Sequence, residues 1–381
     1  MANSNLTSAK KAKNDEFYTQ YHDIEKEMAA YLEFNPDVFR GKTILLPCDD
    51  PEWSNFTRYF AQNFQTFGLK KLISTSFAAD SKNYKTNYQP TLFEMDSPEF
   101  DAKKTNVKGK IFTLTKDENH DGKINVEDLQ WHYLKGDGDF RSDEIKKLRD
   151  EADIIITNPP FSLFREFLAW LVNSRKQFCI IANKNAVTYK EVFPLIKENK
   201  IWSGRTEWAG GMWFETKNPN DVDRVIDGKD YKNVSSMWLT NIDHGRRHQK
   251  LPLMTMAENL KYSKHKEIKG RENYAKYDNY DAIEVPFTDA IPDDYDGVMG
   301  VPISFLDKYS PEQFEIVGMC ENEDLYKLKT KIYANQEKKD AYFAKFRKAG
   351  QYDLNASGVV IIDGKHEKVY QRVLIKKRES K

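Results

Sequence analysis

The sequence has few cysteines, no long apolar run and no net charge. Its 381 residues include three cysteines (Cys48, Cys179 and Cys320), which are too few and too scattered for a disulfide framework or a zinc site. No stretch approaches the roughly 20 apolar residues that cross a bilayer. The polar N-terminal residues also lack the apolar centre of a secretory signal. We therefore expect a protein with no membrane association and a cytoplasmic location.

The charges balance, with 59 Lys and Arg against 59 Asp and Glu. Any contact with nucleic acid would therefore need a local basic patch. One run, residues 246–271, is rich in Lys and Arg and contains only two acidic residues, Glu258 and Glu267. Taken alone, such a run is more often a solvated face.

Apolar runs alternate with helix-like periodicity in the first part of the chain, which predicts an α/β fold. Helical spacing occurs near residues 20–34, 56–68 and 162–174, and buried strands are expected at 42–50, 70–77, 129–140, 152–158 and 177–188. This alternation predicts a mostly parallel, Rossmann-like sheet with helices on both faces. Ligands bind such sheets beyond the C-terminal ends of the strands.

Two segments break this rhythm and suggest the domain boundaries. Residues 80–128 replace a single crossover helix and are expected to form an excursion. Beyond about residue 245, short strand-like runs mix with one charged helix near 334–348, which predicts a second, α+β domain. The expected organisation is a flexible polar arm (1–14), an α/β domain (15–245) and an α+β domain (246–381).

Residues 152–167, ADIIITNPPFSLFREF, join a strand to a helix through two prolines framed by an amide and an aromatic ring. The Asn158 side chain offers an acceptor oxygen. Pro160 has no N–H and forces Pro159 into an extended conformation, which fixes the direction of the Pro159 carbonyl. Two rigid acceptors suit the two hydrogens of an exocyclic amine. Phe161 adds a surface on which a base can stack, which is worth about 1–3 kcal/mol.

The loop therefore predicts a catalytic site, formed by residues 158–161, for a flipped-out adenine or cytosine. Holding both amine hydrogens would free the nitrogen lone pair for attack on a methyl donor, so that positioning and local polarity carry the chemistry. The alternative interpretation is a rigid Pro-Pro turn followed by a core phenylalanine.

At this point the sequence resembles the DNA amino-methyltransferases, and within them the EcoRI-type adenine methyltransferase family. TNPPFSLFREF resembles the family's catalytic motif, and WLTNIDHGRR and VMGVPISFLDKYSPEQFEIVG resemble its later segments. The resemblance covers most of the chain. It implies a site-specific DNA adenine-N6 methyltransferase that flips its target base and uses S-adenosylmethionine as cofactor. It also implies that residues 15–245 form the methyltransferase domain and residues 246–381 a target-recognition, DNA-binding domain.

Three further elements resemble the cofactor-binding parts of this family: KNDEFYTQYHDIEKEM, LLPCDDPEWSNF and GDGDFRS. By this resemblance, Asp139 would accept a hydrogen bond from the adenine amino group of the cofactor, and Phe140 would pack on its ring. The implied cofactor residues are Phe17, Tyr18, Thr19, Pro47, Cys48, Asp49, Asp50, Asp139, Phe140 and Asn158.

The sequence departs from the wider methyltransferase pattern in two places. The first cofactor loop lacks the usual run of glycines, so the residues that hold the methionine part are open. The strand LISTSF does not end in the acidic residue that usually binds the ribose hydroxyls, and Asp80, a few residues later, is a weak substitute.

The resemblance also implies double-stranded DNA as partner, because a flipped base costs a few kcal/mol that DNA contacts must offset. Trp208, Trp213 or Trp238 could form the second wall of the base pocket, although such tryptophans are usually core residues. A cognate restriction endonuclease is left open, and no stable protein partner is expected. The residues expected to contact phosphates are Arg246, Arg247, Lys250, Lys261, Lys264 and Arg271.

Residues 117–128, DENHDGKINVED, match the ligand spacing of a calcium loop. Position 12 is aspartate rather than the usual glutamate, and the flanking segments look like strands instead of helices. A polar turn between two strands is the simpler interpretation, and no metal is expected. The potential ligands would be Asp117, Asn119, Asp121, Asn125 and Asp128.

Several functions therefore compete. Adenine-N6 methylation leads, and N4-cytosine methylation is a close alternative because both bases present an exocyclic amine. An RNA or protein-glutamine methyltransferase would use similar loops, although the long C-terminal domain favours duplex DNA. A calcium-dependent interaction module, in which NPPF is only a turn, is the alternative from another class of protein.

Overall fold

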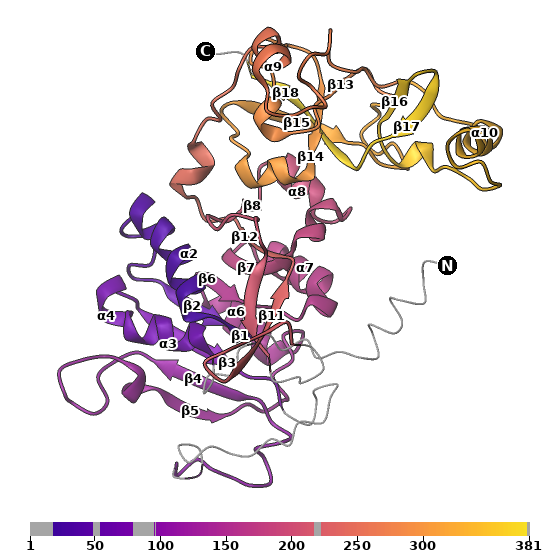
Figure 1. Ribbon diagram of the computed structural model, residues 1–381. Helices are drawn as coiled ribbons and strands as arrows, with labels where there is room; N and C mark the ends of the chain where they lie inside the picture. The colour runs from indigo at the N-terminus through magenta and orange to yellow at the C-terminus, as the bar shows by residue number, and fades with distance from the viewer. Residues whose placement is uncertain (1–17, 49–53, 79–94, 96, 217–221, 379–381) are drawn as a thin grey trace. The chain divides into compact units, whose positions relative to one another are not determined.

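The structure, a computed structural model, describes residues 18–48, 54–78, 95, 97–216 and 222–378 (Figure 1). The chain divides into two compact units. The first unit consists of Met1–Glu191 with Ile201–Gly245, and the second of Val192–Lys200 with Arg246–Lys381. Among the described residues, every helix is too short or too polar to cross a membrane.

An eight-stranded sheet forms the centre of the first unit, in the order β5-β4-β3-β2-β6-β7-β12-β8. The four central strands, β3, β2, β6 and β7, are parallel. Their sequences are almost continuously apolar, as expected for strands covered on both faces. The strands are β2 (Thr43–Leu46), β3 (Lys71–Thr75), β4 (Lys110–Leu114), β5 (Gln130–Tyr133), β6 (Ile154–Thr157), β7 (Gln177–Asn183), β8 (Trp202–Ser203) and β12 (Ser236–Thr240).

The sheet is mixed, which corrects the expectation of a mostly parallel one. Strands β4 and β12 run antiparallel to both of their neighbours. As a result β5 and β8 return to the direction of the central strands, because each pairs with a reversed strand. Strand β4 lies inside residues 80–128, so part of the segment expected as an excursion belongs to the sheet.

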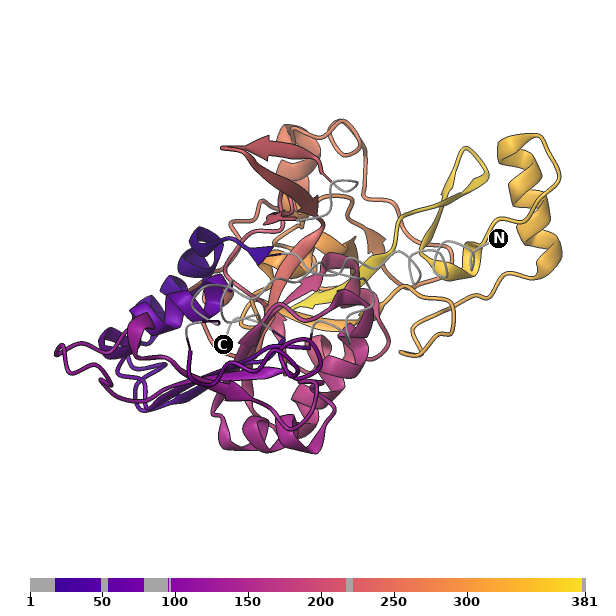
Figure 2. The same ribbon diagram turned by 90° about the horizontal axis from the view of Figure 1, so that it is seen from below.

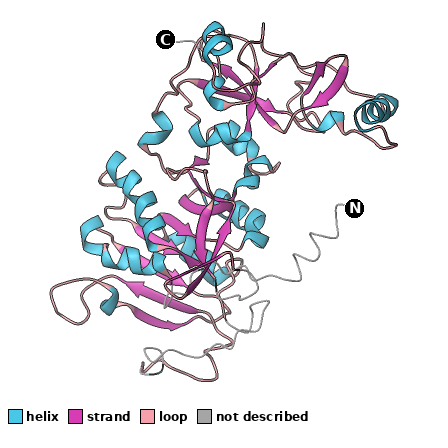
Figure 3. Cartoon of the chain, in the orientation of Figure 1, coloured by secondary structure: helices cyan, strands magenta, loops and turns pink. Residues whose placement is uncertain are grey.

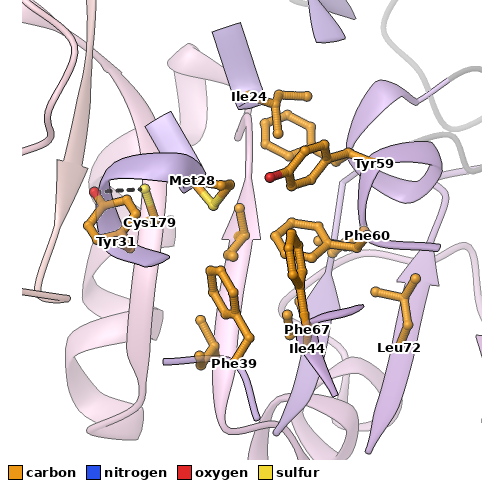
Figure 4. Close-up of a cluster of buried hydrophobic side chains, with 14 of the residues drawn as sticks. Ile24, Met28, Tyr31, Phe39, Ile44, Tyr59, Phe60, Phe67, Leu72 and Cys179 are labelled. Atoms are coloured by element: carbon orange, nitrogen blue, oxygen red, sulfur yellow. Dashed lines mark hydrogen bonds between the residues drawn. The ribbon is translucent and has the colours of Figure 1, made fainter. Parts of the chain in front are cut away.

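Helices cover the two faces of this sheet. Figures 1 and 2 show α2 and α3 on one side and α6 and α7 on the other. Because side chains alternate along a strand, Ile44 and Leu46 both belong to the core that α2 to α4 cover. Figure 4 shows Ile44 in this core, near Phe39 and Phe60. The helices are α2 (Tyr21–Phe34), α3 (Asn55–Gln62), α4 (Phe64–Phe67), α6 (Asp143–Glu151) and α7 (Phe164–Ser174).

A smaller sheet of the first unit contains β1 (Tyr18–Thr19), β9 (Met212–Glu215), β11 (Lys229–Val234) and β10 (Arg224–Ile226), in this order. Met212 and Phe214 are buried in the core, while Trp213 and Glu215 alternate with them on the half-exposed face. The turn between β10 and β11 has positive φ angles at Asp227 and Gly228, as a two-residue hairpin turn requires.

The second unit mixes short strands with short helices. Its sheet has the order β13-β14-β18-β15, and a separate hairpin pairs β16 with β17. Inside the sheet, the buried Arg372 guanidinium donates to Glu284, which also accepts a hydrogen bond from Tyr277. The elements are α8 (Phe193–Lys197), α9 (Met256–Tyr262), β13 (Ile283–Glu284), β14 (Met299–Pro302), β15 (Phe314–Met319), α10 (Asn335–Phe346), β16 (Val359–Ile362), β17 (Lys365–Lys368) and β18 (Arg372–Lys377).

Candidate active site

The strand order creates a switch point between β2 and β6. From β2 the chain continues to β3 on one side, whereas β6 pairs with β2 on the other side. Loops leaving two such strands diverge and open a crevice at their C-terminal ends. The first cofactor loop leaves β2 at Pro47, and the NPPF loop leaves β6 at Asn158. The expected cofactor and catalytic loops therefore start side by side.

A hydrogen bond joins the two loops directly. The buried Thr157 hydroxyl, at the end of β6, donates to the carbonyl oxygen of Pro47. The next residue, Cys48, has φ +68°, a left-handed conformation that is uncommon outside glycine. Strained backbone of this kind is concentrated at ligand sites and turns. The start of the turn after β2 is thus bonded to the residue that precedes the NPPF loop.

The NPPF loop is fixed at both ends. Pro160 is extended (φ −56°, ψ 119°), and its carbonyl accepts a hydrogen bond of 2.9 Å from the Leu163 N–H. This bond closes a 3₁₀ turn, Phe161–Leu163, that leads into α7. Asn158 is half-buried, and the partly buried Phe161 packs against the hydrophobic core while keeping some exposure. The loop thus presents an amide and an aromatic ring from a rigid backbone.

The GDGDF loop, which follows β5, lies against the end of β3. Gly138 has φ +87°, and a Cβ atom there would lie 2.1 Å from the carbonyl oxygen of Ser76. The Ala78 N–H donates to the Asp137 carbonyl at 2.7 Å, which ties the two loops together. Glycine is thus required here both by its conformation and by the close approach of the two backbones.

Asp139 is engaged by a neighbouring arginine. The Arg141 guanidinium donates to both Asp139 oxygens, at 2.9 and 2.6 Å, and also reaches Glu166 on α7 at 3.1 Å. The hydrogen bonds from Arg141 lower the pKa of Asp139 against the smaller effect of its partial burial. Asp139 is therefore an ionised acceptor at neutral pH, and a ligand that bonds to it would share it with Arg141.

Phe140 lies in the core instead of lining an open surface. It is 5% exposed, and its ring meets the edges of Phe167 and Trp170 of α7, with ring centroids 5.1 and 5.9 Å away. The structure shows a packing role that holds the loop against α7. The expected stacking of Phe140 on the cofactor stays a prediction.

The N-terminal element is anchored beside the first cofactor loop. Tyr18 and Thr19 pair with Glu215 and Phe214 of β9. The Thr19 carbonyl accepts a 2.8 Å hydrogen bond from the Asn55 side chain, at the start of α3. This places β1 next to the helix that follows the loop after Cys48. Three expected cofactor residues, Phe17, Asp49 and Asp50, lie outside the described residues.

The three candidate tryptophans differ in exposure. Trp238 is fully buried against Phe56, and Trp208 is 7% exposed and donates to the Ser203 hydroxyl. Trp213, on β9, is half-buried, and the Arg224 guanidinium lies 4.9 Å from the centre of its ring. Of the three, Trp213 has the most ring surface that a ligand could reach.

The basic run of the second unit is only partly exposed. Arg246 pairs with Asp307, and both side chains are largely buried. Arg247 donates to Asn199, which also belongs to this unit. Lys264 pairs with Asp289. The predicted phosphate-binding residues on the exposed surface are Lys250, Lys261, Lys264 and Arg271.

The side-chain oxygens of residues 117–128 bind the backbone of their own loop. Both Asp128 oxygens accept backbone N–H groups, from Glu118 and Asn125. Asp117 accepts from the N–H groups of Asp121 and Gly122. Asn119 and Asn125 likewise accept from the N–H groups two residues ahead of them. Within the described residues, no group of three or more His, Cys, Asp or Glu side chains is placed to hold a metal ion.

Sequence reasoning missed two features of the first unit. Glu27 of α2 is fully buried and accepts hydrogen bonds from the backbone N–H groups of Arg205 and Thr206, 178 and 179 residues away. The bond from Thr157 to Pro47 spans 110 residues. Pairings over such distances leave no local pattern, although a glutamate at a core position of an amphipathic helix signals a buried partner.

The chain has an α/β fold with a switch point between a turn with left-handed backbone and the Asn-Pro-Pro-Phe loop, and α/β proteins bind their ligands at such switch points. Comparison with known proteins identifies the family. The sequence profile described as "Adenine-specific methyltransferase EcoRI" matches residues 5–378. The chain therefore belongs to the EcoRI adenine-specific methyltransferase family, as the sequence resemblance indicated.

Curated relatives agree with this assignment. The chain is 42% identical to the type II methyltransferase M.EcoRI of Escherichia coli, over 83% of this chain and 89% of the relative. It is 34% identical to M.MgeORF184P of Mycoplasma genitalium, over 97% and 98% of the two chains. It is 33% identical to M.MpnI of Mycoplasma pneumoniae, over 87% and 91%. No solved structure gives a significant match. The chain is thus an enzyme, a methyltransferase, and the interaction-module alternative is set aside.

Proposed function

We propose that this enzyme transfers a methyl group from S-adenosylmethionine to N6 of a flipped-out adenine at a specific site in double-stranded DNA. The observation that carries the proposal is the junction of the two loops at the switch point, where the Thr157 hydroxyl binds the Pro47 carbonyl. A methyl donor held after β2 and an amine held after β6 would meet there. Membership of an adenine-specific family favours adenine over cytosine.

The donor groups around the switch point fit this cofactor. The ionised Asp139 is an acceptor for an amino or hydroxyl group of the adenosine part, and Tyr18 and Thr19 belong to a strand that is bonded to the start of α3, the helix after the first cofactor loop. When bound, the cofactor supplies an activated methyl group on a sulfonium sulfur. The absence of a glycine run in the first loop is offset by the left-handed backbone at Cys48, which shapes the turn without glycine.

The NPPF loop performs the catalytic work by holding the amine. In the proposed mechanism, the Asn158 side-chain oxygen and the Pro159 carbonyl each accept one hydrogen of the N6 amino group. This arrangement leaves the nitrogen lone pair directed at the methyl donor, and acceptors fixed before the reaction need little reorganisation. Phe161 stacks on the flipped base. After transfer, the amine releases one proton, with solvent as the final acceptor.

We further propose that the second unit recognises the DNA target. Its exposed cations Lys250, Lys261, Lys264 and Arg271 neutralise phosphates, with Tyr262, which is 61% exposed, between them. Arg246 and Arg247 instead hold this unit together through Asp307 and Asn199. A cognate restriction endonuclease would share the recognition site, without a stable complex between the two proteins.

The experiment is long-read sequencing of DNA from a methylation-free host that expresses this protein. We expect N6-methyladenine at one short motif, and none with Asn158→Ala. The matched control is Asn63→Ala, because Asn63 bonds within α3 to the Tyr59 carbonyl and should be dispensable for methylation. Detection of N4-methylcytosine would show that the target base is cytosine and not adenine. Unmodified DNA would overturn the proposed substrate.

A second variant separates base capture from DNA binding. Phe161→Ala should weaken methylation of a correctly paired target more than it weakens overall DNA affinity, because stacking contributes about 1–3 kcal/mol, or roughly 5- to 150-fold. A target adenine opposite a mismatch is partly unstacked already, so it should recover part of the loss. Equal losses on paired and mismatched targets would contradict a stacking role.

A further inference from the structure

A second basic surface lies outside the run at residues 246–271. Residues 331–369 form an arm of the second unit that contains α10 and the β16–β17 hairpin (Figures 1 and 3). The arm has a small core of its own, made by Tyr333, Ala341, Leu354 and Val359. The Lys345 ammonium on α10 pairs with Glu367 on β17, which fastens the helix to the hairpin. The helix is therefore held with one defined face outward.

The outward face of α10 presents an aromatic ring between two cations. Lys339 and Phe343 are four residues apart and lie along one stripe of α10, and Arg347, four residues further on, is the left-handed C-cap at the end of the helix. All three are exposed, and Phe343 is 56% exposed. Ala341, on the opposite face, is buried in the core of the arm. A large apolar side chain held outward between cations indicates a binding surface more than a packing residue.

The charges of the arm favour an anionic partner. Lys331 and Lys345 are used inside the unit, on Asp278 and Glu367. Other exposed cations have no carboxylate within ion-pair distance among the residues that the structure describes. These cations are Lys339, Arg347, Lys348 and Lys365. Their charge is therefore available to a partner that approaches the face of Phe343.

We propose that the outer face of α10 binds the DNA backbone beside the recognition sequence, with Lys339 and Arg347 on phosphates and Phe343 against the sugars between them. Arg347 caps the helix that carries Lys339, so a rise of about 1.5 Å per residue separates the Cα atoms of the two cations by about 12 Å. Contacts of this kind position the duplex without reading its sequence. The proposal rests on the proposed function, because it extends the DNA contacts of the same substrate.

The test compares binding to two duplexes, measured by fluorescence anisotropy over a range of salt concentrations. One duplex ends next to the methylated motif, and the other continues well beyond it on both sides. Lys339→Ala combined with Arg347→Ala should lower the steepness of the log–log salt dependence on the long duplex by about two, since each phosphate contact contributes about 0.9. The short duplex should show little change. Phe343→Ala should weaken binding of the long duplex alone.

Two further variants on the same face act as controls. Gln336→Ala removes an uncharged neighbour and should leave the salt dependence unchanged. Asp340 accepts a hydrogen bond from Gln336 and carries the negative charge of this face, so Asp340→Lys should tighten binding of the long duplex. Unfolding midpoints equal to that of the wild type would show that the arm remains folded.

Equal salt dependence for the wild type and the double variant would overturn the proposal and assign this face to another kind of partner. Equal losses on both duplexes would also overturn it, because the contact would then not lie in the flanking DNA. Methylation is measured separately by sequencing. If no site is methylated, the proposed function is refuted, and the double variant is then compared with the wild type on a long duplex of arbitrary sequence, where a lowered salt dependence leaves the arm's contact with DNA standing.

Discussion

Replacing Glu27 with glutamine should destabilise the first unit by about 1–3 kcal/mol, although the two side chains have nearly the same shape. The Glu27 carboxyl group is fully buried and accepts four hydrogen bonds. One oxygen binds the Tyr31 hydroxyl (2.8 Å) and the Arg205 N–H (2.6 Å). The other binds the N–H and the hydroxyl of Thr206, both at 2.7 Å.

The magnitude follows from counting donors. Glutamine replaces one acceptor oxygen by an NH₂ group, which faces two donors whichever way the amide turns. A hydroxyl can rotate and become an acceptor, but a backbone N–H cannot, so one N–H of Arg205 or Thr206 is left without its partner. An orphaned buried donor costs about 1–3 kcal/mol. Glu27→Ala orphans both N–H groups and leaves a cavity, so its cost should be clearly larger.

Tryptophan fluorescence during urea unfolding measures the loss of stability in the first unit, which contains Glu27. All the tryptophans that the structure describes fall in the first unit. The matched control is Glu33→Gln on the exposed side of the same helix, which should change stability by less than about 0.5 kcal/mol. If Glu27→Gln unfolded at the same urea concentration as this control, the carboxyl group would not bind the loop as described, and the reasoning would fail.

Three other changes test the rest of the site. Gly138→Ala should cost several kcal/mol and abolish cofactor binding, measured by calorimetry, because a Cβ would lie 2.1 Å from the Ser76 carbonyl oxygen. Arg141 lowers the pKa of Asp139, so the ionised Asp139 stabilises the protein at neutral pH, and this contribution disappears as the pH falls through the lowered pKa. Asp139→Asn should therefore lower the unfolding midpoint at pH 7 but not in strong acid, and an equal loss at both pH values would contradict this origin. A thiol reagent should label Cys48 first in the native protein, because burial raises the pKa of both other cysteines; bound S-adenosylmethionine should slow this labelling, and unchanged rates would place the cofactor elsewhere.

The central strands were predictable because strands buried on both faces are continuous apolar runs. The segments at 42–50, 70–77, 152–158 and 177–188 contain β2, β3, β6 and β7. The direction of a strand could not be predicted from the sequence, because hydrophobicity has the same period in a parallel and an antiparallel strand. The reversal at β4 depends on pairing with β3 and β5. No local pattern within residues 110–114 encodes that pairing.

The candidate site shows the same division. The position of Asn158 at the end of a strand and before a helix follows from the residues around it, because prolines and apolar periodicity are local signals. The bond from Arg141 to Asp139 could also be predicted, since the two residues are two positions apart. The bond from Arg141 to Glu166 could not, because it depends on how α7 packs. The burial of the Phe140 side chain likewise depends on the aromatic rings of α7. The burial of this loop residue is determined by a helix that lies later in the sequence, so the residues around Phe140 do not predict it.

The anchoring of the NPPF loop explains why two prolines are used where one glycine would make the turn. Fixing the backbone of a flexible residue costs about 1–2 kcal/mol of free energy. If the loop became ordered only when a substrate bound, this cost would reduce the binding free energy of the substrate. Here Thr157 holds the loop's start on Pro47, and the Leu163 N–H holds its end on Pro160. Between these anchors the proline rings remove most of the remaining freedom of Pro159 and Pro160. The acceptors are therefore already ordered when the protein folds, and under the proposed function the binding energy of a base would remain available for extruding it from the duplex.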